Sequence, residues 1–305
     1  MLNKLWLSAF SVFFLASASS AAGINFDGPG EGLKAGLSSA EVPEASPAQD
    51  KGIITDWLFG NSHQAAQKAP AEWTIMVYIN GKNDLEPYAL KDMNEMEMVG
   101  SNPKMNIVVE AGRMAGYSEE DGDWKGMRRY LITKDNDVNK ISSKPLEKIA
   151  KADMGDYRTL AAFGQWAKAA YPARKYMLIV WNHGSGWEKG LKDVVSKGIS
   201  YDEETDNHIT TPQLGMALKA IGKVDVYGSD ACLMQMPEVD YELRNSADYI
   251  VGSEETEPGD GYTYNTFLGP LAANPSMSPA QLALVAVDSY ANHYQQSGEA
   301  PPRAS

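Results

Sequence analysis

The sequence predicts an α/β protein with a mostly parallel central sheet and helices on both faces. Apolar runs rich in β-branched residues, such as Thr74–Ile79, alternate along the chain with segments of helical spacing. These runs are continuously apolar, which is typical of strands buried on both faces of a parallel sheet. The region from residue 71 to 305 is long enough for one sizeable domain of this class.

The expected strands and helices follow one another in a regular order. Strands are expected at 74–79, 105–111, 128–132, 176–181, 224–227 and 249–253. Helices are expected at 85–99, 156–170, 211–221 and 278–294. In the first helix Leu90, Met93 and Met96 share one face, so we interpret its methionines as core residues rather than as ligands. Thr210 or Thr211 is the expected cap of the third helix, whose first turn contains Pro212.

The N-terminal segment, residues 1–22, predicts a secretory signal peptide. One lysine precedes an apolar run, Leu5–Leu15, which is too short to span a bilayer, and small residues follow up to Ala22. We therefore expect a secreted or periplasmic protein. Residues 23–70 are rich in Gly, Ser, Ala and Pro, and they predict a flexible linker or a pro-segment that covers the active site.

The overall charge of the chain bears on its partners. The formal net charge is −13, which disfavours nucleic acid as a ligand because phosphate binding requires Lys and Arg. An acidic protein is compatible with basic peptide substrates, although acidity mainly reports solubility.

Cys232 is the only cysteine in the 305 residues, and it follows a predicted strand. The strand of Val224–Tyr227 ends at Gly228 and Ser229, three residues before Cys232. A lone cysteine is usually a small buried apolar residue. In an exported chain it can instead be a reactive thiol, and a catalytic thiol needs a histidine near it in space.

His183 is the candidate partner of this cysteine. The apolar strand of Tyr176–Trp181 is followed directly by Asn-His-Gly-Ser-Gly-Trp, which contains His183. The carboxyl ends of strands in an open α/β sheet form the edge where ligands bind. Because both residues follow such strands, we expect a Cys232–His183 dyad.

The chemistry expected of this dyad is nucleophilic. His183 would take the proton of the Cys232 thiol and later protonate the leaving amine. The backbone N–H groups of Gly184 and Cys232 are the expected donors to the oxyanion. A glycine at position 184 allows the backbone to approach the substrate without a Cβ clash.

Three motifs together resemble the clostripain family of cysteine peptidases, part of the wider group with caspases, gingipains and legumains. They are WTIMVYINGKNDLE from Trp73, NHGSGW around His183 and SDACLMQMPEV around Cys232, and the similarity extends roughly from Trp73 to Asn265. The resemblance implies a caspase-like fold, a peptidase domain over residues 71–305 and cleavage after Arg or Lys. Family members usually continue well past the position of Ser305, which leaves open that this domain is C-terminally incomplete.

Cleavage after basic residues requires an acidic pocket. Asp230, two residues before Cys232, matches the family motif and is the first candidate; Asp260, in Glu-Pro-Gly-Asp-Gly-Tyr, is the second. The alternative for Asp230 is a carboxylate satisfied by backbone N–H groups in its turn. The alternative for Asp260 is an ordinary turn aspartate.

The acidic segment Asp202–His208 raises the question of a metal. Its oxygen ligands could bind calcium, but it lacks the glycine and the spacing of an EF-hand. The alternative is a solvated run of charges, and we assign no metal ligand. The proposed chemistry requires no cofactor.

The segment between His183 and this acidic run predicts self-cleavage. Residues 187–198 contain three lysines and two glycines, which is typical of an exposed loop that a peptidase can enter. The resemblance implies maturation by cleavage in this region, and we expect the cut after Lys197 or, second, after Lys192. The alternative is an uncut loop.

The sequence is compatible with three functions. The first is a secreted cysteine endopeptidase that acts on peptides or proteins with Arg or Lys at the cleavage site. The second is a thiol hydrolase of non-peptide esters or amides. The third is an inactive caspase-like binding module, which the presence of both His183 and Cys232 disfavours.

Overall fold

The computed structural model describes residues 70–187 and 197–297. The predicted signal peptide, nearly all of the predicted linker or pro-segment, and Lys192 lie outside the described residues. The first strand begins at Ala71. Within the described part of the chain, no helix is long and apolar enough to cross a membrane.

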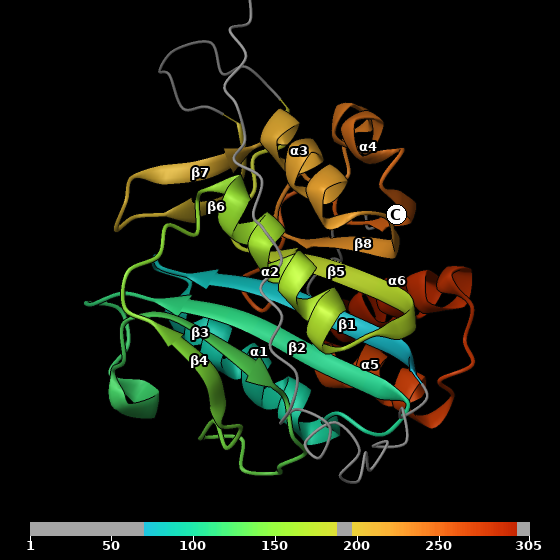
Figure 1. Cartoon of the computed structure of the whole chain (residues 1–305), viewed down its shortest axis with the longest axis horizontal. Coiled ribbons are helices and arrows are strands. Elements are labelled where there is room, and N and C mark those ends of the chain that lie inside the picture. Colours follow the sequence, from blue (N-terminus) through green and yellow to red (C-terminus); the bar gives the residue numbers. More distant parts are fainter. Residues whose placement is uncertain (1–69, 188–196, 298–305) are drawn as a thin grey trace, which may run out of the picture. The chain divides into compact units, whose positions relative to one another are not determined.

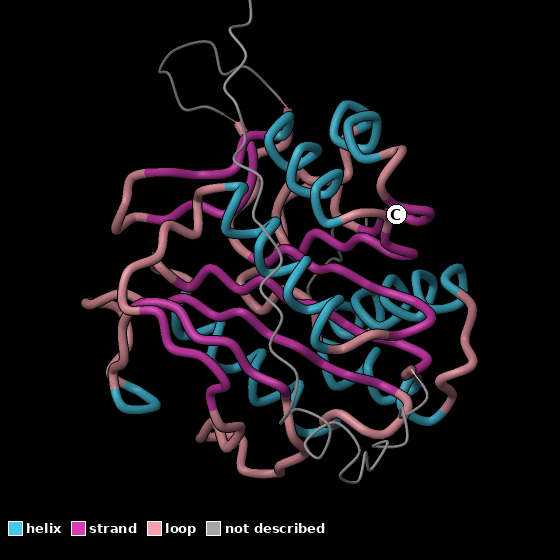
Figure 2. Tube along the Cα trace, in the orientation of Figure 1, coloured by secondary structure: helices cyan, strands magenta, loops and turns pink. Residues whose placement is uncertain are grey.

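The centre of the fold is a seven-stranded sheet in the order β4-β3-β2-β1-β5-β8-β9 (Figures 1 and 2). The strands β2, β1, β5, β8 and β9 are parallel, whereas β3 and β4 are antiparallel at one edge. The bounds are β1 Ala71–Gly81, β2 Met105–Arg113, β3 Gly126–Leu131, β4 Pro145–Ile149, β5 Ala173–Trp181, β8 Val224–Asp230 and β9 Ala247–Val251. The predicted mostly parallel sheet is therefore confirmed.

Helices cover both faces of this sheet, as predicted (Figure 1). Side chains of β1 alternate between two apolar cores: Ile75 and Val77 contribute to one, Met76 and Tyr78 to the other. The first core is shared with α1 (Glu86–Val99), α5 (Tyr264–Ala273) and α6 (Pro279–Ser297). The second is shared with α2 (Tyr157–Ala170), α3 (Thr211–Ile221) and α4 (Pro237–Leu243).

The caps of two helices follow from local sequence. Thr210 caps α3: its side chain accepts a hydrogen bond from Gln213 N, and Thr210 N donates one to Gln213 Oε1. Before α1, the side chain of Asn83 accepts a hydrogen bond from Leu85 N, which closes the turn that leaves β1. That turn brings the segment 82–85 to the carboxyl edge of the sheet.

Several elements were absent from the predicted pattern. The acidic segment forms the turn of a two-stranded hairpin between β6 (Gly198–Asp202) and β7 (Asn207–Thr210), not a simple loop. Strand β4 and helix α5 were also missed. Strand β4 is an edge strand with an exposed Leu146, so it lacks the continuous apolar run of a central strand.

Candidate active site

The register of β5 and β8 brings His183 and Cys232 to the same edge of the sheet. Trp181 pairs with Asp230 at the ends of these neighbouring parallel strands, and Asn182 N donates a hydrogen bond to Asp230 O at 3.2 Å. His183 and Cys232 each follow this pair by two residues. Both line one cleft of about 310 Å³, which also contains Leu85, Trp181, Asn182, Asp230, Ala231, Glu257, Pro258, Gly259 and Gly261.

The loops that carry the two residues are in direct backbone contact. A Cβ atom added at Gly184 would lie 2.4 Å from Cys232 O, too close for any side chain. Gly186 has a φ of 59°, and a Cβ there would lie 2.5 Å from Met236 Sδ. Glycine is therefore required where the His183 loop crosses the Cys232 loop. The prediction that Gly184 lets the backbone approach the substrate stays a prediction, since the contact seen here is with the Cys232 loop.

Cys232 is partly buried, and its sulfur has a backbone partner. Glu257 N lies 3.2 Å from Cys232 Sγ and donates a hydrogen bond to it. Leu233, the next residue, has a φ of 62°, a conformation that is rare for a large side chain and that occurs at functional turns.

The imidazole of His183 contacts an aspartate that sequence analysis missed. His183 Nε2 lies 2.7 Å from Asp84 Oδ1, and the two side chains are 44% and 60% exposed. Asp84 belongs to the turn after β1, the strand adjacent to β5. A signal for it was present in the sequence, because a polar turn after a predicted parallel strand reaches the same sheet edge.

Asn182 holds the turn of His183 in place. Its side-chain Nδ2 donates a hydrogen bond to Asn80 O at 2.5 Å, and its Oδ1 accepts one from Tyr201 N at 2.6 Å. These bonds connect the ends of β1 and β5 to the β6 strand. Beneath them, Trp181 Nε1 donates to the buried Asp92 Oδ2 at 2.7 Å.

Asp230 lines the cleft and is also bound within the protein. Its side chain accepts hydrogen bonds from Tyr262 N at 3.0 Å and from the Tyr264 hydroxyl at 2.8 Å, and the residue is 4% exposed. Burial raises the pKa of Asp230 to about 7, against the opposing effect of these donors. Asp230 therefore lines the cleft, and its carboxylate is also satisfied by hydrogen-bond donors from Tyr262 and Tyr264.

Asp260 is not among the residues that line the cleft. Its carboxylate forms ion pairs with Lys91 at 2.8 Å and with His293 at 3.8 Å. The neighbouring Glu257 lies in the cleft instead, and sequence analysis missed it. The signal was weak, because a Glu-Pro-Gly-Asp-Gly turn does not indicate which of its two acids points inward.

Two acids of the hairpin turn form ion pairs with one lysine. Lys82 is fully buried, and its Nζ lies 2.5 Å from Glu204 Oε2 and 3.3 Å from Asp202 Oδ2; it also donates to Ala152 O. Among the described residues, no group of three or more His, Cys, Asp or Glu is arranged to hold a metal ion. The ammonium group of Lys82 lies beside Asp202 and Glu204, two acids of the segment considered above for calcium.

One of the two expected cleavage sites lies next to the His183 loop. Lys197 immediately precedes β6, and Gly198 is buried in that strand. Gly198 N donates to Ser185 Oγ at 3.2 Å, and Gly198 O accepts from Ser185 N at 2.9 Å. The peptide bond between Lys197 and Gly198 is therefore held on its Gly198 side by hydrogen bonds to Ser185.

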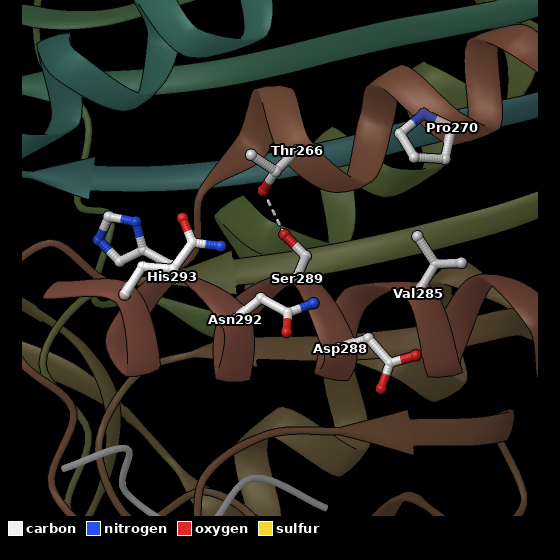
Figure 3. A pocket seen from close by; sticks show the side chains of 8 residues that line it. Thr266, Pro270, Val285, Asp288, Ser289, Asn292 and His293 are labelled. Atoms are coloured by element: carbon white, nitrogen blue, oxygen red, sulfur yellow. Dashed lines mark hydrogen bonds between the residues drawn. The ribbon is translucent and has the colours of Figure 1, made fainter. Parts of the chain in front are cut away.

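A second cleft lies between α5 and α6 (Figure 3). It is lined by His293 and by polar residues such as Asn292, and Thr266 bonds to Ser289 across it. Neither His183 nor Cys232 lines this cleft. His293 is thus separate from the cysteine site, in agreement with the choice of His183.

Comparison with known proteins adds to this geometry. The clostripain family (peptidase C11) matches residues 77–303. Clostripain from Hathewaya histolytica is 29% identical over 231 residues, which cover 66% of this chain and 42% of that protein. A secreted C11 cysteine protease from Bacteroides thetaiotaomicron, solved with an irreversible peptide inhibitor, has a TM-score of 0.58 and 27% identity, covering 74% of this chain and 59% of that one.

A third similarity concerns the fold alone. An inactive zymogen C11 protease from Parabacteroides distasonis has a TM-score of 0.56 at 24% identity, covering 74% of this chain and 60% of that one. The chain therefore spans less than two thirds of the length of these relatives.

Proposed function

This chain belongs to the clostripain family, and we propose that it is a cysteine endopeptidase that cleaves after Arg or Lys through Cys232 and His183. One observation supports this proposal above all others. The paired ends of β5 and β8 are each followed, two residues later, by a member of the dyad, and both members line one cleft. A nucleophile and a base at the same sheet edge are the minimum requirement for thiol-dependent acyl transfer.

The proposed mechanism begins with the orientation of the imidazole. A carboxylate only accepts hydrogen bonds, so His183 Nε2–H donates to Asp84 and Nδ1 is left to receive the thiol proton. The thiolate of Cys232, with Glu257 N–H as a donor, attacks the carbonyl carbon of the substrate. His183 then protonates the leaving amine, and water hydrolyses the thioester. All of these groups belong to the chain, and no cofactor is needed.

The oxyanion of the tetrahedral intermediate needs backbone donors. We propose the N–H groups of Gly184 and Cys232, since their loops are in backbone contact beside the cleft. Removal of one such donor typically lowers turnover by about 10²–10³.

Specificity for basic residues would come from Asp230. Its carboxylate is buried at the cleft that contains Cys232, and among the described residues no Lys or Arg lines that cleft. A guanidinium or ammonium group from the substrate would supply the missing positive charge. We also propose export through the signal peptide predicted at residues 1–22. We further propose self-cleavage between residues 187 and 198, because this segment contains lysines after which such an enzyme would cut. Lys192 is the better site of the two, because Gly198 is held in β6.

The test uses a chloromethylketone with Arg at the reactive position and a panel of peptide and ester substrates. We expect labelling of wild-type protein at Cys232, cleavage after Arg and Lys, and no labelling or cleavage by Cys232→Ala or His183→Ala. The intact masses of wild type and Cys232→Ala report self-cleavage from the same preparations. Hydrolysis of esters without peptides would favour the non-peptide hydrolase, and an unlabelled Cys232 would favour the binding module.

A further inference from the structure

The carboxyl group of Glu257 has no role in the mechanism above. Glu257 lines the cleft together with Cys232 and Asp230, and its Oε1 is buried without any hydrogen-bond partner. The backbone N–H of Glu257 donates a hydrogen bond to Cys232 Sγ, so the residue that carries this carboxyl group is held beside the nucleophile. A buried carboxyl oxygen without a donor is costly, which indicates that a donor is missing from the free protein.

We propose that Glu257 is a second specificity residue, which shares one proton with Asp230 in the free enzyme and exchanges that proton for the cation of the substrate. This inference rests on the proposed cleavage after basic residues. The side chains of Glu257 and Asp230 are in hydrogen-bonding contact, while Oε1 of Glu257 is left without a partner. Two carboxylates in such contact and shielded from water cannot both be ionised without a cation, so one proton is shared between them. When a guanidinium enters, the proton leaves to solvent and two carboxylates face the planar fork.

The described surroundings of this pair contain further acids. Asp92 and Glu95 of α1 act on Asp230, and Cys232 acts on Glu257. The hydroxyl groups that interact with the pair come from Tyr262 before α5, Tyr264 of α5 and Tyr290 of α6. His183 lies on the same cleft, whereas Lys91 and His293 are engaged by Asp260.

Titration of the pair agrees with this arrangement. Burial raises the pKa of Asp230 to about 7, and burial with the neighbouring Asp230 charge raises the pKa of Glu257 well above its usual range. The pair therefore retains a proton near neutral pH, and cation binding becomes tighter as the pH rises and that proton is lost. Arg is preferred over Lys, because a guanidinium can bond to both carboxylates at once whereas an ammonium is a point charge.

The experiment measures protons directly. Benzamidine, a cation that is not hydrolysed, is titrated into full-length Cys232→Ala protein by calorimetry in buffers of different ionisation enthalpy. We expect release of close to one proton per site at pH 6, and release falling toward zero at pH 9. Binding without proton release at pH 6 would overturn the proposal, and this measurement does not depend on whether a Glu257 variant folds.

Kinetics of a matched pair of variants complete the test. Glu257→Gln should lower kcat/KM for an Arg peptide by roughly 10- to 100-fold, the loss of one charge-assisted hydrogen bond. Glu254→Gln, which removes an exposed charge three residues away that is not among the residues lining the cleft, should stay within about twofold. If wild type cleaves after Arg and both variants match it, this inference fails alone. If wild type does not cleave after Arg or Lys, the proposed function fails.

Discussion

Two clusters of buried acids lie near the same edge of the sheet, and only one of them contains a cation. Near the hairpin, the buried Asp202 and the half-exposed Glu204 are bound by Lys82. In the cleft, hydroxyl and backbone donors bind Asp230, Glu257 Oε1 has no donor, and no Lys or Arg of the described chain lines the cleft. The first cluster is complete in itself and joins the β1 turn to the hairpin. In our proposal, the second is completed by a positive group of the substrate.

This difference separates a structural cluster from a recognition cluster. Burial of a carboxylate is expensive unless a partner compensates it. Where the protein supplies the partner, the cluster stabilises the fold. Where it does not, as for Asp230 and Glu257, we propose that a cationic ligand offsets the cost of burial. Composition alone does not make this distinction, because both clusters are acidic sequence segments beside strand ends.

Removal of the internal cation should have the largest effect. Lys82→Met keeps a similar volume but leaves the buried Asp202 carboxylate without its cation, which should destabilise the protein by about 3–5 kcal/mol. Urea unfolding of Lys82→Met and of Lys82→Met/Asp202→Asn checks this, and the double variant should recover a large part of the loss. Equal instability of both variants would contradict the pairing.

The unpaired cluster should show its cost in the pH dependence of stability. The folded pKa of Asp230 lies near 7, above the unfolded value of about 3.9, so its stabilising contribution is present below pH 4 and is lost as the pH rises through 7. Asp230→Asn should therefore gain stability relative to wild type between pH 5 and pH 8, by at least about 1 kcal/mol.

Urea unfolding of wild type and Asp230→Asn at several pH values measures this contribution together with the altered titration of Asp92 and Glu257, which interact with Asp230. Parallel stability curves would mean that Asp230 is not the uncompensated acid. The same variant should cleave more slowly after Arg and Lys, which links the stability cost to recognition.

The exposed acid at the dyad should have the smallest effect. Asp84→Ala removes the acceptor of His183 Nε2 and should lower kcat by about tenfold with little change in KM, since the imidazole loses its orientation. Asp84→Asn keeps a hydrogen-bond acceptor and should retain more of the activity than Asp84→Ala. Equal kcat values for wild type and Asp84→Ala would exclude a positioning role for Asp84.

The sequence by itself determined the parts of this protein that depend on local pattern. Continuous apolar runs predicted the central strands, helical spacing predicted α1, α2, α3 and α6, and Thr210 was one of the two residues predicted to cap α3. His183 and Cys232 could be proposed as a dyad because each follows such a strand. Side-chain periodicity and turn chemistry are properties of a few neighbouring residues, and the order of elements adds which strand ends share an edge.

Only the tertiary structure decided which charges meet. Lys82 and Glu204 are 122 residues apart, and His183 and Asp84 are 99 residues apart. No local pattern carries that information, since a carboxylate is the same residue whether it is buried, paired or exposed. Asp260 and Glu257 differ by three positions, but one contacts Lys91 at the surface and the other lines the cleft. Their chemistry depends on the solvent and partners around each oxygen, and packing alone sets both.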